Sequence, residues 1–181
     1  MDITARKRVF GTAVSLFVVG VVSPAIFWLV CAGLDQAFGL RRLVGQPWSS
    51  IIAAASVLIG VFWILWAWSY LLFVGQGLPL EVLGRALHPT QILVTTGPYA
   101  YTRNPMVLGL LFILLAVAFF RGTLSGFVMV PAVGLLTWGY LAIFEERGLM
   151  KRFGASYEKY RRDVPLLFPR LSAYGRIPTV E

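Results

Sequence analysis

Four long apolar runs dominate the chain, and its polar residues gather between and after these runs rather than alternating with apolar ones. A bilayer core about 30 Å thick needs about 20 apolar residues in a helix, and the runs meet or approach that length. They cover residues 9–32, 49–74, 105–120 and 123–144. The pattern predicts an all-α integral membrane protein with four transmembrane helices.

The last two apolar runs are joined by a very short polar link. The link is Arg121, Gly122 and Thr123, the last of which also begins the fourth run, and a link this short predicts an antiparallel helical hairpin. Pro131 lies inside the fourth run and predicts a kink rather than a break, because other groups in a membrane helix can satisfy the freed backbone.

Composition supports the same class of protein. The 181 residues are 58% hydrophobic and 13% charged, which is far too apolar for an ordinary soluble domain. The length predicts a single domain over residues 1–181. Cys31 is the only cysteine, which excludes an intramolecular disulfide and a multi-cysteine metal site, and we expect no metal.

The distribution of basic residues predicts an orientation. With a cytoplasmic N-terminus, thirteen of the sixteen Lys and Arg residues fall on the cytoplasmic side, as the positive-inside rule requires. Both termini and the loop at residues 76–104 are then cytoplasmic. The net charge of +8 lies beside apolar runs, so anionic lipid headgroups are the expected partner and nucleic acid is not. We expect a multi-pass protein of a prokaryotic cytoplasmic (inner) membrane.

The loop before the third run ends in residues suited to anion binding. Asn104 and Pro105 form a good N-cap and first-position pair, so the third helix should begin there with the positive end of its dipole facing the cytoplasm. Arg103 adds a full positive charge. Together these residues predict a binding point for a carboxylate or a phosphate.

Two adjacent carboxylates, Glu145 and Glu146, follow the fourth run. They are poorly placed for a helix C-terminus, where the dipole prefers cations, so a positive partner is expected nearby. From charge alone two interpretations stay open. The glutamates belong to a site, or they solvate the helix end and pair with Arg147 or Lys151.

A stripe of apolar residues continues beyond the glutamates. Its members recur at spacings of four, four, three and four, which predicts an amphipathic helix ended by Pro165. They are Leu149, Phe153, Tyr157, Tyr160 and Val164. Such a helix should lie along the headgroups or fold over the cytoplasmic opening of the bundle.

These pieces, taken in order, resemble the isoprenylcysteine carboxyl methyltransferase and phospholipid methyltransferase superfamily of membrane enzymes. The matching stretch runs from about residue 91 to residue 169. It contains LVTTGPY at 93–99, YTRNPM at 101–106, an apolar hairpin, the glutamate pair, and the stripe up to Val164-Pro165.

The resemblance implies methyl transfer from S-adenosylmethionine, in a pocket formed by the last two membrane helices and capped by the cytoplasmic loop and the C-terminal amphipathic helix. Glu145 suits the cofactor's ammonium, Arg103 its carboxylate and Tyr99 its aromatic ring. The candidate catalytic residues are Arg103, Glu145 and Glu146. The expected cofactor-binding residues are Gln91, Ile92, Leu93, Val94, Gly97, Tyr99, Arg103, Asn104, Pro105, Met106, Val107 and Glu145.

Two positions depart from the family pattern. Asn104 stands where most members have histidine, so any contact that needs an imidazole is lost. Leu141 stands where the eukaryotic prenylcysteine enzymes have an arginine that contacts the substrate carboxylate. The expected methyl acceptor is therefore a lipid or another hydrophobic or amphiphilic molecule, such as a phospholipid amine or a small thiol or amine.

Two other functions remain open. One is a prenylcysteine-type carboxyl O-methyltransferase in which another arginine, such as Arg147, binds the carboxylate. The other is a non-catalytic membrane accessory protein that has kept the scaffold.

Overall fold

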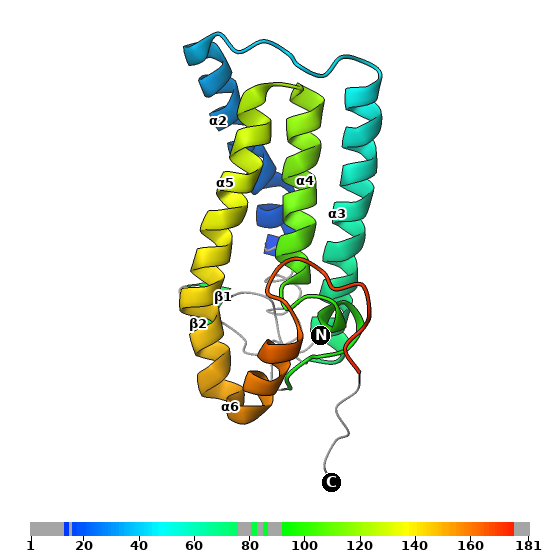
Figure 1. Cartoon of the computed structure of the whole chain (residues 1–181), viewed down its shortest axis with the longest axis vertical. Helices are drawn as coiled ribbons and strands as arrows, with labels where there is room; N and C mark the ends of the chain where they lie inside the picture. The colour runs from blue at the N-terminus through cyan, green and yellow to red at the C-terminus, as the bar shows by residue number, and fades with distance from the viewer. Residues whose placement is uncertain (1–12, 15, 76–80, 83–84, 87–91, 176–181) are drawn as a thin grey trace. The chain divides into compact units, whose positions relative to one another are not determined.

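The computed structural model describes residues 13–14, 16–75, 81–82, 85–86 and 92–175. It confirms the all-α fold, apart from one antiparallel pair of two-residue strands (Figure 1). In chain order the elements are η1 (Val18–Val22), α2 (Ser23–Phe38), α3 (Trp48–Phe73), β1 (Glu81–Val82), β2 (Arg85–Ala86), η2 (Gly97–Ala100), α4 (Pro105–Arg121), α5 (Leu124–Tyr140), η3 (Leu141–Glu145) and α6 (Glu146–Asp163).

Among the described residues, three helical segments are long and apolar enough to cross a membrane: Val18–Phe38, Trp48–Phe73 and Leu124–Asp163. The helix of the third apolar run, α4, is shorter, with 17 residues. Apolar side chains cover much of the helical surface, and residues such as Leu58, Leu135 and Leu136 are more than two thirds exposed. A surface of this kind is stable in lipid and not in water, so the chain is an integral membrane protein.

The chain divides into two compact units, each described by itself. Unit 1 contains Met1–Phe62 and Gly109–Thr137, and unit 2 contains Trp63–Leu108 and Trp138–Glu181. The core of unit 1 is built on Phe27, Cys31 and Leu114. Cys31 is fully buried and therefore acts as a small packing residue.

Within unit 1, the end of α4 and the start of α5 form the expected hairpin. Gly122 has φ 67°, a conformation that glycine adopts without strain, and its amide donates to the carbonyl of Ala118 at 2.8 Å. A Cβ at Gly126 would lie 2.8 Å from the Cα of Ala118, so glycine here lets the two helices approach closely.

The first helix continues to Phe38, beyond its expected end at residue 32, although Asp35 carries a charge into it. That carboxylate is neutralised within unit 1. Arg121 pairs with it, and Thr123 and Ser125 donate hydroxyl hydrogen bonds to it at 2.9 and 2.5 Å. Because the charge is paired, it does not end the helix, and Gly39 in the left-handed conformation ends it instead.

In unit 2, α6 follows the π-helical turn η3 without a gap, so the expected amphipathic helix is joined directly to the fourth apolar run. It is not one straight helix. Gly154 has φ 53° and ψ −129°, which turns the chain inside α6. The bend is visible at the lower end of Figure 1. The predicted stripe nevertheless packs inward, with Tyr157, Tyr160 and Val164 buried against the protein.

Candidate functional site

The short helix η2 carries the first part of the site into the core of unit 2. Gly97 begins η2 with φ 61°, and a Cβ there would lie 2.3 Å from the ring of Tyr70. Only glycine fits both the backbone angle and the space. Tyr99 then packs with Ala67 and Val94 in a buried cluster.

A C-terminal segment, residues 164–174, is hydrogen-bonded along the chain from residue 100 to residue 104. We call this segment the C-terminal strap. Its backbone pairs with that of Ala100, Tyr101 and Arg103 at 2.9 to 3.0 Å. The buried hydroxyl of Thr102 donates to the carbonyls of Leu166 and Leu167. The strap therefore fixes the backbone that leads into α4.

The start of α4 lies where the sequence predicts it. Pro105 is the first helical residue, and the carbonyl of Asn104 accepts the hydrogen bond of Leu108. The side-chain amide of Asn104 donates to the carbonyl of Leu166 in the strap at 3.5 Å. Asparagine at this position thus ties the helix start to the strap.

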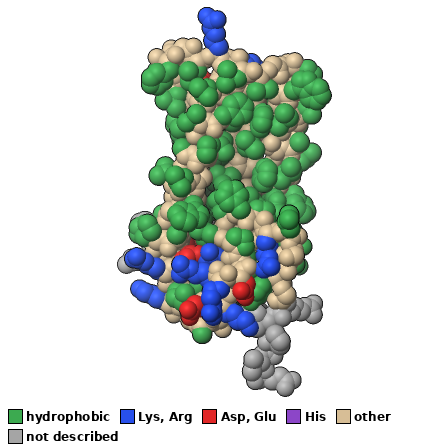
Figure 2. Space-filling view, in the orientation of Figure 1, with side chains coloured by type: hydrophobic (Ala, Val, Ile, Leu, Met, Phe, Trp, Pro, Cys, Tyr) green, Lys and Arg blue, Asp and Glu red, His purple; other side chains and the backbone are tan. Residues whose placement is uncertain are grey.

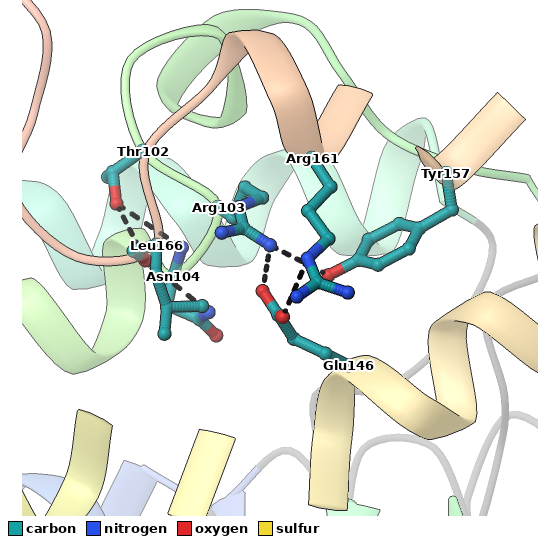
Figure 3. A network of polar contacts seen from close by, with 7 residues as sticks. All are labelled: Thr102, Arg103, Asn104, Glu146, Tyr157, Arg161 and Leu166. Carbon is teal, nitrogen blue, oxygen red and sulfur yellow. Dashed lines mark hydrogen bonds and ion pairs between the residues drawn. The ribbon is translucent and has the colours of Figure 1, made fainter. Parts of the chain in front are cut away.

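A cluster of charged and phenolic side chains lies beside this helix start, and Figure 3 shows its contacts. We call it the Arg103 cluster. Arg103 donates to Glu146 and to the Tyr157 hydroxyl, and Arg161 binds the second carboxylate oxygen of Glu146 at 3.1 Å. The side chains of Arg103 and Glu146 are only 9% and 5% exposed, whereas that of Arg161 is 51% exposed.

Both glutamates lie at the end of the π-helical turn η3. The amide of Glu146 donates to the carbonyl of Leu141, five residues earlier, so the turn holds one residue more than an α-helical turn. Leu141 and Glu146, at the two ends of this hydrogen bond, are both buried. Glu145 is half-buried beside them.

The charge of Glu145 acts on the core of unit 2. Burial raises the pKa of Tyr99 well above its ordinary value, and the charges of Tyr160 and Glu145 raise it further. The Tyr99 phenol is therefore neutral at physiological pH, and Glu145 lies within electrostatic range of it. Burial lowers the pKa of Arg103, which still carries its charge because a guanidinium titrates far above neutrality.

The structure brings together many, but not all, of the expected site residues. Val94, Tyr99 and Met106 share one packed cluster, and Leu93 packs against Tyr157 and Tyr160. Ile92 is 49% exposed, and Val107 is half-buried in α4. Gln91 lies outside the described residues.

Some contacts of the site were not predicted. Arg161 and the carbonyl of Leu166 carried no signal in the sequence, because their pairing depends on the turn at Gly154 and on the path of the strap. Tyr157 and Tyr160 were recognised as members of an apolar stripe and of the family resemblance, and no role was predicted for their hydroxyls. The Tyr157 hydroxyl accepts from Arg103, and the Tyr160 hydroxyl donates to the carbonyl of Tyr99 at 2.7 Å.

Comparison with known proteins gives three matches. Residues 48–156 match the model of the family described as phospholipid methyltransferase. A methanethiol S-methyltransferase 2 from Bradyrhizobium diazoefficiens is 32% identical over 147 residues, which cover 75% of this chain and 54% of that protein. A protein-S-isoprenylcysteine O-methyltransferase from Schizosaccharomyces pombe is 36% identical over 81 residues, 43% of this chain and 33% of that protein.

The fold and site define a class: a small multi-span membrane protein with a buried ionic cluster at the start of an apolar helix. The family match covers more than half of the chain. The protein belongs to the superfamily of membrane methyltransferases that contains the phospholipid and isoprenylcysteine enzymes. The chain spans about half the length of the first of these relatives and a third of the second.

Proposed function

We propose that the chain is an S-adenosylmethionine-dependent methyltransferase that acts on a lipid or another hydrophobic or amphiphilic acceptor at the cytoplasmic membrane face. The observation that carries the proposal is Arg103, buried just before α4 and paired with Glu146. Its Nε atom is buried and has no hydrogen-bond partner among the residues that the structure describes. A buried donor of this kind suits an anionic ligand group.

The residues present fit the cofactor. Its amino-acid end is zwitterionic, so it requires an anion and a cation within a few ångströms of each other. Glu145 and Glu146 are adjacent, and Glu146 contacts Arg103, so unit 2 holds charges of both signs close together. Arg103 and the positive end of α4 would hold the carboxylate, and Glu145 the ammonium. Leu93, Val94 and Met106 supply apolar surface near Tyr99.

When bound, S-adenosylmethionine supplies a methyl group on a sulfonium, which an acceptor atom can displace in line. The protein's part is to position and to exclude water, which can supply much of the acceleration. Buried Tyr99, Tyr157 and Tyr160 keep the site poor in water, and the strap holds the backbone of residues 100–104. Glu146 keeps the buried Arg103 neutralised.

The acceptor class follows from Leu141. This residue is only 3% exposed and apolar, so no cation stands one turn before Glu145 to receive an acceptor carboxylate. We therefore favour a phospholipid amine or a small amphiphilic thiol or amine. The relative named methanethiol S-methyltransferase supports a thiol among these. A prenylcysteine carboxyl group is the second candidate, supported by the other relative.

The cytoplasmic placement rests on charge. The exposed side chains of α6 include Arg147, Lys151, Arg152, Lys159 and Arg162, and Lys and Arg side chains gather over this part of unit 2 in Figure 2. Positively charged segments next to membrane helices face the cytoplasm and attract anionic headgroups.

A methyl-transfer assay tests the proposal. Membranes containing the chain would receive S-adenosylmethionine with a labelled methyl group, and the label would be separated into lipid, volatile thioether and base-labile ester. We expect label in lipid or thioether, lost in Glu145→Gln and kept in the exposed control Glu158→Gln. Label found only in base-labile ester would contradict this acceptor class and would favour a prenylcysteine-type carboxyl O-methyltransferase.

Calorimetry separates an enzyme from a scaffold without activity. Folded protein in detergent should bind S-adenosylhomocysteine, the product of methyl transfer. Absence of binding at high micromolar ligand would favour a non-catalytic accessory protein and overturn the proposal.

A further inference from the structure

The turn at Gly154 produces a pairing that the linear sequence does not suggest. Glu146 and Arg161 are fifteen residues apart. Along a continuous helix they would be separated by about 22 Å, because each residue advances the helix by 1.5 Å. The turn returns the second half of α6 toward the first, and Arg161 binds Glu146 at 3.1 Å.

The two oxygens of Glu146 are divided between two arginines. Oε1 accepts from buried Arg103, and Oε2 accepts from half-exposed Arg161. The charge of Arg161 is close enough to lower the pKa of Arg103, so the two guanidinium groups repel each other. Glu146 lies between them and binds both. Each arginine therefore limits the positions that the Glu146 carboxylate can take. Through the carboxylate, each arginine also limits the position of the other.

The hydrogen bonds of Arg103 show what this arrangement controls. One nitrogen, Nη1, contacts both Glu146 and the Tyr157 hydroxyl. Nε is buried without a partner in the described part of the chain. The orientation of the guanidinium plane therefore depends on where Glu146 holds Nη1, and that orientation aims the remaining donors.

We propose that Arg161 is a positioning residue of the cofactor site: through Glu146 it holds Arg103 in the orientation that receives the cofactor's carboxylate. The proposal rests on the proposed function. Arg161 does not itself contact the cofactor. Its removal lets Glu146 rotate with Arg103, which weakens binding of the carboxylate and leaves the nucleoside end of the ligand unaffected.

Two related ligands isolate this effect. S-adenosylhomocysteine carries the carboxylate, and 5′-methylthioadenosine lacks the whole amino-acid end. In Arg161→Gln we expect the affinity for S-adenosylhomocysteine to fall about fivefold, the scale of a partly exposed ion pair, with the affinity for 5′-methylthioadenosine unchanged. Arg161→Lys, which keeps the charge, should recover most of the loss.

The neighbouring arginine is the matched control. Arg162 is exposed and adjacent in sequence, so Arg162→Gln makes the same change in net charge. It should leave both affinities unchanged. In turnover assays Arg161→Gln should raise the KM for S-adenosylmethionine about fivefold with kcat unchanged at saturation.

Each outcome decides between roles. Equal weakening of both ligands in Arg161→Gln would indicate a general structural defect and overturn the positioning role. The same loss in Arg162→Gln would assign the effect to net charge and overturn it as well. A folded wild-type protein that binds neither ligand would overturn the proposed function itself. If the wild type binds and Arg161→Gln binds equally well, only the positioning role is overturned.

Discussion

Two buried ionic clusters, one in each unit, use the same chemistry for different ends. In unit 1, Asp35 pairs with Arg121 and also accepts from Thr123 and Ser125, a group we call the Asp35 cluster. In unit 2, Glu146 is shared by Arg103 and Arg161. The first cluster is balanced, with one negative and one positive side chain. The second has two cations on one carboxylate.

The surroundings extend this contrast. The guanidinium of Arg121 also lies over the ring of Trp28 at 4.8 Å, so the Asp35 cluster is enclosed by contacts that join α2 to the α4–α5 turn. The Arg103 cluster has one arginine 51% exposed and a second carboxylate, Glu145, adjacent in sequence. A pair of matched charges stabilises a fold, whereas a cluster with an additional, partly exposed cation can bind a charged ligand.

The largest expected effect comes from breaking the Asp35 cluster. Asp35→Leu leaves Arg121 buried and unpaired, which should lower the free energy of unfolding by about 3–5 kcal/mol. Chemical unfolding in detergent measures it. The double variant Asp35→Leu/Arg121→Leu should recover most of the loss, and the affinity of the folded fraction for S-adenosylhomocysteine should not change. A single variant as stable as wild type would contradict a structural role.

The next largest effect on stability is expected at Gly97, which begins the short helix η2 that precedes Arg103. Gly97→Ala places a Cβ 2.3 Å from the Tyr70 ring at φ 61°. Backbone strain and overpacking together should cost about 2–4 kcal/mol of unfolding free energy. Gly139→Ala is the control, since nothing lies within 4 Å of a Cβ there. If both alanines are tolerated alike, the close contact with Tyr70 is not a constraint.

The two glutamates allow a direct comparison within the Arg103 cluster. Glu145→Gln should weaken S-adenosylhomocysteine affinity about tenfold or more, because a charge-assisted hydrogen bond to the ammonium is lost. Glu146→Gln should weaken that affinity less and lower stability more, because its carboxylate neutralises buried Arg103. Calorimetry and unfolding curves measure the two quantities. Equal losses of affinity would count against the division of roles.

The smallest effect on the free energy of unfolding is expected at the turn in α6. Gly154→Ala requires an L-residue at φ 53° and ψ −129°, which should cost about 1–3 kcal/mol of unfolding free energy. No atom lies within 4 Å of a Cβ there, so the cost is conformational and not steric. Gly33→Ala, in open space within α2, is the matched control and should be neutral or stabilising. A neutral Gly154→Ala would show that the turn does not depend on glycine.

Much of the fold was accessible from the sequence because membrane helices are specified locally. The apolar runs located the helices, Asn104-Pro105 located the start of α4, and the three-residue link indicated the hairpin. The stripe from Leu149 to Val164 indicated which face of α6 is buried. The end of α2 was misjudged because Asp35 reads as a helix terminator until Arg121 is seen beside it.

For the candidate site, the sequence indicated which residues take part but not how they pair. The sequence indicated that Arg103, Glu145 and Tyr99 belong to one region. It did not indicate that Glu146 pairs with Arg103, because that contact depends on the extra residue in the π-helical turn. Arg161 could not be assigned at all, since a regular helix would carry it away from Glu146.

The sequence by itself determined a multi-span membrane protein, because burial of apolar runs in lipid depends on length and composition alone. Its ordered motifs from about residue 91 to residue 169 carried the resemblance to a methyltransferase superfamily. The tertiary structure decided which charges meet. Ion pairs need atoms within a few ångströms of each other, and the pairs here join residues separated by tens of positions. In unit 2, the π-turn before Glu146 and the turn at Gly154 bring Glu146 to Arg103 and Arg161.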